Sequence, residues 1–221
     1  TAVAGERPEG DVPQEGDEGW NLSARGTWAP FVAPGRILHF GAAVWRHEPQ
    51  DSTSALRWRS KPELNVTGVT LVDTGTLGAV DDFTTVGLEA AGVWGPFSVQ
   101  GESMRVQRVP ASGPDLAFDG WYVQTSYVIT GETRPYKVAG GVFDRVLPNA
   151  AVGRGGLGAW QVAVRLSGID LSHAGITGGR ERNLTLGLNA YLTANIRLVL
   201  NHVRVLEVDG IMRTTTQIAL S

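Results

Sequence analysis

The sequence contains no cysteine among its 221 residues. This excludes a disulfide framework and any metal site built from thiolates, and it is compatible with an exported bacterial protein. The chain also lacks an apolar run of about 18 residues, which excludes a transmembrane helix. Neither charge sign is in large excess, because 19 lysines and arginines are balanced by 22 aspartates and glutamates. The formal net charge of −3 argues against a nucleic-acid binder, which needs a basic surface.

Motifs of catalysis and metal binding are missing as well. The four histidines, at positions 39, 47, 173 and 202, have none of the spacings typical of metal ligands. Residues Gly153–Gly158 match G-x-G-x-x-G, but a dinucleotide site needs a helix after this motif, and the pattern here predicts a strand. No nucleophile elbow and no pair of catalytic carboxylates stands out. We therefore expect no metal and no cofactor, and we expect that the protein is not an enzyme.

The clearest positive feature is a stretch of alternating character at 180–206. Leucines and an alanine occupy every second position of its first half, and polar residues lie between them. Successive side chains of a strand point to opposite sides, so the pattern predicts two long antiparallel strands around a tight turn at Thr193–Asn195. One face of this hairpin is apolar. It fits a soluble β-sandwich whose core covers the leucines, and equally a membrane barrel in which lipid contacts them.

The same alternation recurs along the chain and predicts about ten strands with no convincing helix. Residues 1–19 are polar and predict a loop, and 64–78 predict irregular structure or a short strand. The predicted strands lie at 20–29, 36–47, 54–61, 82–93, 97–108, 118–130, from 160 onward, in the two halves of the 180–206 hairpin, and at 212–221.

The predicted connections differ in length, with short ones at 94–96 and 193–195 and longer ones at 109–117, 131–157 and 169–180. Outer-membrane barrels have short turns mostly at one rim and long loops mostly at the other, whereas sandwiches mix their loop lengths less regularly. Aromatic residues near strand ends would form the interfacial girdles of such a barrel. These residues are Trp20, Trp28, Trp94, Trp121, Trp160 and Tyr191. Both features favour an antiparallel transmembrane β-barrel.

Several blocks, in the right order, resemble the phosphate-selective porin O/P family of Gram-negative outer membranes. The most specific are Thr130-Gly-Glu-Thr-Arg-Pro-Tyr136 and the hairpin block Gly178–Asn189 with Asn195–Leu198. The other blocks are Leu38–Ala43, Arg59–Glu63, Leu71–Gly75, Trp94–Glu102, Gly158–Arg165 and Ile169–Leu171. Together they extend over nearly the whole chain from about residue 20.

The resemblance implies an antiparallel barrel of about sixteen strands, a size that leaves an aqueous channel. Residues 1–221 would form the C-terminal part of it, with 131–157 either folded into the lumen or left outside. We also expect a processed or partial chain, because Thr1 is not a translational start and the usual terminal aromatic is missing after Leu220. The implied function is passive diffusion of anions such as phosphate or polyphosphate. The implied setting is a homotrimer in the lipid of a Gram-negative outer membrane.

An anion pore needs fixed positive charge on its polar face. By alternation with the leucine face, Arg165 and Arg197 point into the lumen. A second group alternates with Leu56 and Trp58, and a third lies in the 131–157 connection. The second group is Arg57, Arg59 and Lys61, and the third is Arg134 and Lys137.

Two alternatives remain open at this level. The lumenal arginines either contact anions or pair with lumenal carboxylates such as Glu89 or Glu102 and only brace the wall. The chain as a whole is either a porin or a soluble or surface β-sandwich that binds carbohydrate or a protein partner. The exposure of the hairpin leucines discriminates between these folds, since a sandwich buries them and a barrel does not. These leucines are Leu184, Leu186, Leu188, Leu198 and Leu200.

Overall fold

The computed structural model describes residues 20–48, 55–61, 63, 69–110, 113–209 and 215–220. Nearly all regular structure in this part of the chain is β, with one short 3-10 turn, η1 (Val138–Gly140). No helix among these residues is long and apolar enough to cross a membrane. The strands are β1 (Trp20–Ala33), β2 (Arg36–Glu48), β3 (Ala55–Leu56), β4 (Arg59–Ser60), β5 (Val72–Asp73), β6 (Leu77–Trp94), β7 (Phe97–Pro110), β8 (Leu116–Val128), β9 (Tyr136–Lys137), β10 (Val142–Phe143), β11 (Ala159–His173), β12 (Ile176–Tyr191), β13 (Arg197–Val208) and β14 (Thr215–Leu220).

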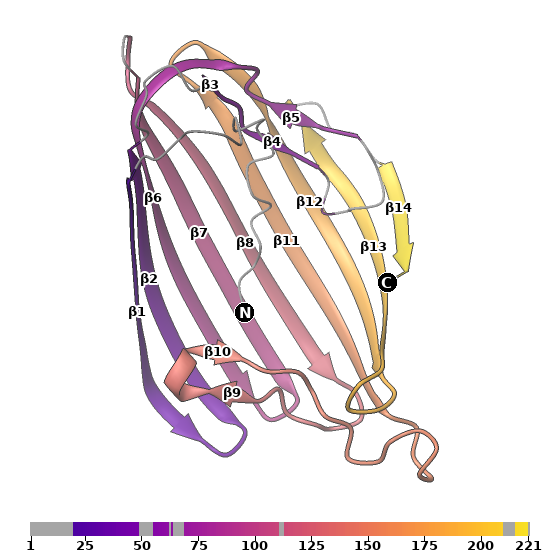
Figure 1. Ribbon diagram of the computed structural model, residues 1–221. Coiled ribbons are helices and arrows are strands. Elements are labelled where there is room, and N and C mark those ends of the chain that lie inside the picture. Colours follow the sequence, from indigo (N-terminus) through magenta and orange to yellow (C-terminus); the bar gives the residue numbers. More distant parts are fainter. Residues whose placement is uncertain are drawn as a thin grey trace.

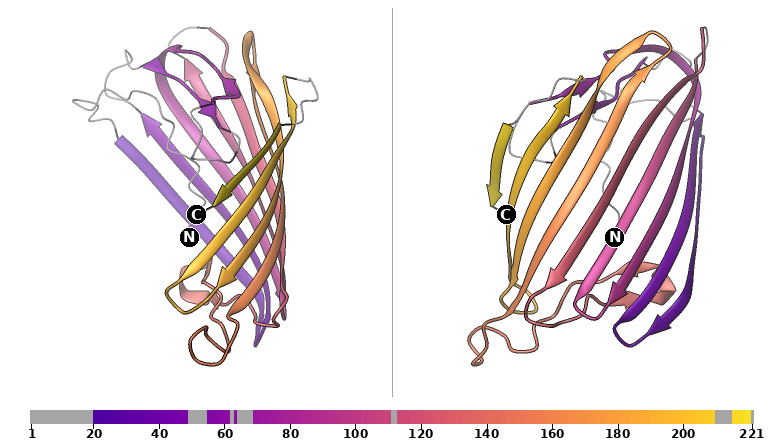
Figure 2. Two further views of the ribbon diagram at one scale, coloured as in Figure 1. Left: turned by 90° about the vertical axis from the view of Figure 1, so that its right-hand side faces the viewer. Right: turned by 180° about the vertical axis from the view of Figure 1, so that it is seen from behind.

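Ten strands form one sheet, which confirms the predicted all-β antiparallel fold class. Its order is β1-β2-β6-β7-β8-β11-β12-β13-β14, and β3 pairs with β6 at the side. Every neighbouring pair is antiparallel. The strands are tilted and the sheet curls into an open trough, with β1 and β14 as its edges (Figures 1 and 2). Two small ribbons, β4–β5 and β9–β10, lie apart from the sheet.

The two faces of the sheet differ as the alternation predicts. On the outer, convex face Leu198 is 57% exposed, Leu186 is 46% exposed and Leu200 is 37% exposed. Leu184 and Leu188, the other two hairpin leucines, are half-buried. No second sheet covers this face among the described residues, which removes the core that a β-sandwich would need. The leucines therefore form an exposed apolar belt, as the barrel interpretation requires.

Strand direction places the connections at two rims, which we name after Figure 1. The lower rim carries the turns at 34–35, 95–96 and 192–196 and the long connection 129–158. The upper rim carries the long connection 49–76 and the connections that follow β7, β11 and β13. The predicted separation of short turns from long loops is therefore wrong, because each rim carries one long connection. The length of a connection does not show which rim it leaves from, because one long connection starts at each rim. The described parts of both long connections lie over the concave face.

The long connection predicted at 169–180 is also wrong. β11 continues to His173 and β12 begins at Ile176, so only Ala174 and Gly175 form the turn. Both have positive φ, 48° and 90°. This is the geometry of a tight hairpin turn, which Asn-Gly or Asp-Gly usually supplies. An alanine in the first position hides that signal in the sequence.

The aromatic girdle is developed at the lower rim. Trp28, Trp94 and Trp160 are exposed on the outer face there, together with Phe31, Phe97 and Tyr127. Two residues assigned to the girdle lie elsewhere. Tyr191 faces the concave side and is buried, and Trp121 lies within β8, where its indole covers Gly168 of β11.

Two apolar clusters attach the long connections to the concave face. Near the upper rim, Val72 and Leu77 pack with Leu116, Phe118 and Leu171 of the wall, and Trp58 packs against this cluster. Near the lower rim, Val146 packs with Val128, Ala159 and Tyr191. Burial of apolar side chains therefore holds both connections against the sheet. We call residues 55–76 the upper segment and residues 129–158 the lower segment. The predictions for 1–19 and for 212–214 lie outside the described residues.

Candidate functional site

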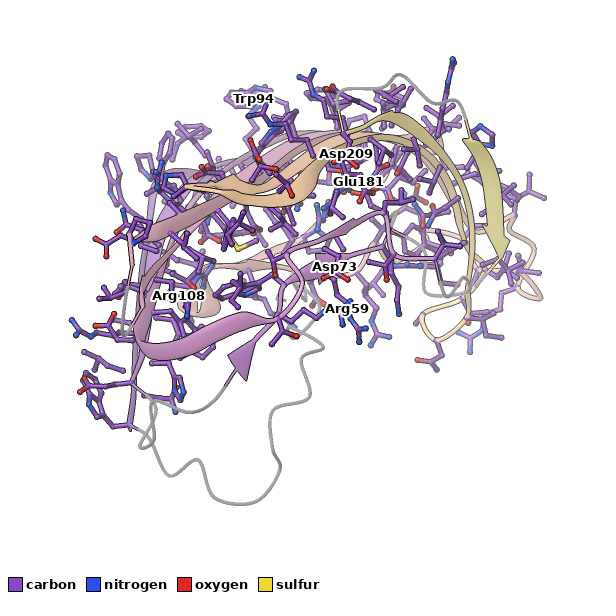
Figure 3. The ribbon with its side chains drawn as sticks, turned by 90° about the horizontal axis from the view of Figure 1, so that it is seen from above. Arg59, Asp73, Trp94, Arg108, Glu181 and Asp209 are labelled. Carbon is purple, nitrogen blue, oxygen red and sulfur yellow. The ribbon has the colours of Figure 1, made fainter. Side chains whose placement is uncertain are left out.

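The concave face of the sheet encloses a hollow of about 1230 Å³. Its wall comes from strands β2, β6, β7, β8, β11, β12 and β13 and from both segments. The upper segment crosses it inside the curve of the sheet, where Arg59 and Asp73 lie, whereas Trp94 lies outside (Figure 3).

Strand alternation explains why this wall is largely polar. On β11, Gln161, Arg165 and Ser167 point inward while Val162 and Val164 point outward. The register joins Arg165 to Gln124 of β8 and to Thr185 of β12. Inward positions of neighbouring strands therefore meet in rows, and the rows of this region carry amide, hydroxyl and guanidinium groups.

Five of the seven predicted pathway cations line the hollow. They are Arg59, Lys61, Arg134, Arg165 and Arg197. A sixth cation of the hollow, Arg145, was not among those predicted, and it also donates a hydrogen bond to the carbonyl of Ala194 at 2.8 Å. It lies in the same connection as Arg134, so counting every cation of that connection would have found it.

The other two predicted cations, Arg57 and Lys137, each form an ion pair across one of the two small ribbons. Arg57 lies just before β4, and its Nε donates to Asp73 Oδ1 of β5 at 2.8 Å. Lys137 of β9 pairs with Asp144 just after β10 at 2.7 Å. The Arg57 hydrogen bond holds the pKa of Asp73 below its usual range, although burial opposes it. Likewise, Lys137 lowers the pKa of Asp144, helped by the backbone N–H of Arg145.

The predicted ladder strand at 54–61 is interrupted. β3 ends at Leu56 and β4 begins at Arg59, so Arg57 and Trp58 lie between two short strands. Trp58 turns toward the wall, where it packs between Phe83 and Phe118. The chain bends there because burial of this indole outweighs the weak pairing of two-residue strands.

Arg165 connects the wall to the upper segment. Its Nε donates to Glu63 Oε1 at 2.7 Å, and its guanidinium lies 3.9 Å from the ring centroid of Tyr122. The other oxygen of Glu63 accepts a hydrogen bond from the Thr185 hydroxyl. Arg165 is therefore charge-paired inside the hollow. Its partner lies 102 positions away in the sequence, which alternation alone does not reveal.

The two carboxylates proposed as braces have other contacts. Glu89 accepts from Arg25 at 2.5 Å and lies 3.1 Å from His39 Nε2. Glu102 accepts from the Tyr122 hydroxyl at 2.7 Å. Bracing of inward arginines by carboxylates therefore occurs, but with partners that the sequence did not identify.

The lower segment crosses the concave face near its rim. The Tyr136 hydroxyl lies 2.5 Å from Nδ1 of His39, which is buried on β2. Arg25 of β1 donates to the carbonyl of Gly141 at 3.1 Å. Arg134 donates to Gln100 Oε1 of β7 at 2.5 Å and lies 4.4 Å from the centroid of Phe143. These contacts hold the lower segment across the concave face, where it occupies part of the cross-section; we call this the narrow level.

Burial lowers the pKa of Arg134. An arginine nevertheless stays protonated in a protein at neutral pH, so it carries a fixed positive charge at this narrow level. Because its side chain is held by Gln100 and Phe143, the charge keeps one position. A charge held in one position lowers the free energy of an oppositely charged ion nearby, and no side chain has to reorganise when the ion arrives.

The hollow contains both signs of charge. Its carboxylates include Glu63, Glu102, Asp144 and Glu181, against the six cations named above. No group of three or more His, Cys, Asp or Glu side chains is placed to hold a metal in the described ranges. The arrangement suits passage of hydrated ions past alternating charges, with Arg134 at the narrow level and Arg59 and Lys61 toward the upper rim.

Comparisons with known proteins agree with this geometry. The family model described as phosphate-selective porin O and P matches residues 8–214. An uncharacterized protein of Caulobacter vibrioides is 33% identical over 197 residues, which are 88% of this chain and 38% of the relative. Porin O of Pseudomonas aeruginosa is 28% identical over 218 residues, covering 86% of this chain and 48% of that protein.

The chain thus spans less than half the length of both relatives. The family match itself covers nearly all of the chain, including every strand from β1 to β13. The chain belongs to the phosphate-selective porin O and P family.

Proposed function

We propose that this protein is a porin of a bacterial outer membrane that passes anions such as phosphate or polyphosphate by diffusion. The proposal rests on family membership and on the separation of the two sheet faces. The observation that carries it is the contrast between the two faces of the sheet. The outer face bears an exposed leucine belt, and the inward wall holds five of the predicted cations.

The mechanism involves no covalent step. Lipid contacts the outer leucines, and the lower aromatic girdle lies at the membrane interface. An anion that enters from the upper rim meets Arg59 and Lys61 and then the level of Arg165 and Arg134. Each cation replaces part of the hydration that the anion loses and raises its local concentration. The neighbouring carboxylates keep binding weak enough for release.

The partners follow from the same proposal. They are outer-membrane lipid along the convex face and small anions in the hollow. We further propose a homotrimer in a Gram-negative outer membrane, which is the setting implied by the family.

Reversal potentials in planar lipid bilayers test the proposal. The complete gene product, held in a potassium chloride gradient and then in a potassium phosphate gradient, is expected to prefer the anion over potassium. Replacement of Arg134, which holds a fixed charge at the narrow level, by Gln should reduce that preference. A reversal potential of the cation-selective sign would contradict anion passage while leaving the fold untouched.

A further inference from the structure

One level of the inward wall is mainly apolar, with a single hydroxyl, that of Thr85. The register places Trp45 of β2 opposite Thr85 of β6, Thr85 opposite Val106 of β7, and Val106 opposite Phe118 of β8. All four line the hollow. Directly opposed residues of neighbouring strands have their Cβ atoms about 5 Å apart. They therefore form a continuous row across four strands.

Aromatic rings extend this row into the upper segment. Trp58 lies 5.3 Å from Phe118 and 6.1 Å from Phe83 between ring centroids, and Trp45 meets Phe83 edge-on at 5.1 Å. We call Trp45, Trp58, Phe83 and Phe118 the aromatic platform. Ring pairs at these separations stabilise one another beyond simple burial. The platform is therefore a rigid patch of the wall.

The four rings have different surroundings. Phe83 and Phe118 are 6% and 3% exposed, so their place is explained by packing beneath the upper segment. Trp45 is 38% exposed on the inward side, and Trp58 is half-buried there. The Trp45 indole is fixed, since its Nε1 donates to Asn21 Oδ1 at 3.2 Å. Packing of the wall does not account for an ordered indole that faces the hollow, where a porin normally presents polar groups.

Two cations follow Trp58 along the upper segment. Arg59 and Lys61 follow Trp58 at one and three positions and line the same hollow. Ser60, between them, adds a hydroxyl to the same lining. The upper part of the hollow thus combines a flat apolar surface with positive charge. A ligand that matches both has an apolar ring face and an anionic group.

We propose that the aromatic platform, with Arg59 and Lys61, binds phosphate monoesters that carry a ring, such as hexose phosphates and nucleoside monophosphates. The inference rests on the proposed anion passage and names a substrate class for that pathway. The ring of the ester lies on the exposed faces of Trp45 and Trp58, and its phosphate faces the two cations. Stacking on an aromatic side chain tightens binding by about fivefold or more relative to an ester without a ring.

Competition with the chloride current through the complete gene product in planar bilayers measures this preference. The probes are glucose 6-phosphate, adenosine monophosphate and glycerol 3-phosphate, which share the phosphate group and differ in the ring. The two ring esters are expected to block the current at concentrations about fivefold lower than glycerol 3-phosphate. Block by only one of them would identify the ring as a sugar or as a nucleobase. Equal block by all three esters would overturn the inference.

Three variants separate stacking from charge. Trp45→Leu keeps an apolar side chain but removes the ring face, so it should abolish the ring preference and leave block by glycerol 3-phosphate unchanged. Trp45→Phe should restore most of the preference. Trp160→Leu is the matched control, because Trp160 is equally exposed, at 37%, but on the outer face. An unchanged ring preference in Trp45→Leu would refute the platform as the site.

A failure of this inference and a failure of the proposed function give different experimental results. Equilibrium titration of the protein with glucose 6-phosphate and adenosine monophosphate measures binding independently of current. A cation-selective pore that binds the ring esters through Trp45 would remove anion passage but retain the site. An anion-selective pore without ring preference would retain the function and remove the site.

Discussion

At the scale of single residues, alternation predicts the direction of a side chain but not its partner. It correctly directs Arg165 and His39 inward, because strand geometry fixes which face each position occupies. The partners Glu63 and Tyr136 come from connections whose path depends on tertiary packing. The arrangement of charge in the hollow was therefore only partly predictable from the sequence.

The pairing of Glu63 with Arg165 leads to the first prediction. Glu63→Gln keeps the size of the side chain and a hydrogen-bond acceptor but removes the negative charge beside Arg165. The anion-to-cation permeability ratio should then rise, by up to about fivefold, since one unit charge at about 4 Å in water contributes ~1 kcal/mol. Reversal potentials measure the ratio. Thr185→Val, which removes the other hydrogen bond of Glu63 without changing charge, is the control, and an equal rise in both variants would contradict the explanation.

The Arg57–Asp73 pair leads to a prediction on pH. Arg57 holds the pKa of Asp73 below its ordinary value of 3.8, so the pair stabilises the upper ribbon at neutral pH and is lost as the pH falls through that lowered pKa. Asp73→Asn should therefore increase transient closures of the channel between pH 5 and 8. As the pH falls through the lowered pKa of Asp73, the behaviour of the wild type and that of the variant should converge.

Single-channel recordings over this pH range provide the measurement. Asp144→Asn, which breaks the corresponding ion pair of the lower ribbon, serves as a matched comparison. A difference between wild type and Asp73→Asn that persists in acid would show that charge pairing is not the cause.

At the scale of elements, the strands were predictable and the connections were not. The period of two located β1, β2, β6, β7, β8 and the β12–β13 hairpin to within a few residues at most ends. It missed the Ala174–Gly175 turn, because a positive φ at alanine has no sequence signature. It could not place the upper segment, whose position depends on burial of Trp58 against strands that are distant in sequence.

The point where the lower segment joins β11 leads to the third prediction. Gly158 has φ +75°, and a Cβ there would lie 2.5 Å from the carbonyl oxygen of Tyr191. Gly158→Ala should therefore reduce the free energy of unfolding by about 2 kcal/mol or more, combining backbone strain with overlap. Gly153 has φ +83° with nothing within 4 Å of a Cβ, so Gly153→Ala should cost only about 1 kcal/mol. Thermal unfolding in detergent compares them, and equal losses would contradict the role of Tyr191.

At the scale of the whole molecule, the curled antiparallel sheet and its two-faced character were predictable, because both follow from strand periodicity. Loop lengths do not separate the two rims, but two other features support the barrel interpretation. These are the exposed leucine belt and the lower aromatic girdle, both of which lie on the convex face. The concave face is instead occupied by two segments that enter from opposite rims (Figure 1).

The proposed contact of the convex face with lipid leads to the last prediction. Leu186 lies in the leucine belt. Along β12 it falls between Leu184, which pairs with Arg204, and Ala190, which pairs with Trp160. An arginine on the lipid face near the bilayer midplane costs about 2–4 kcal/mol, because the bilayer core does not solvate its charge. Leu186→Arg should therefore reduce the free energy of unfolding in lipid vesicles by that amount.

The neighbouring position supplies the matched control. Thr185 precedes Leu186 on the same strand but points inward, where its hydroxyl donates to Glu63. Thr185→Arg places the same charge in the hollow, beside Glu63 and opposite Arg165, and should reduce the free energy of unfolding by less than Leu186→Arg does, because water and Glu63 offset the added charge there. Urea titrations in vesicles compare the two variants. A larger loss in Thr185→Arg than in Leu186→Arg would contradict lipid contact with the convex face, because strand alternation allows only one of these two residues to face the bilayer.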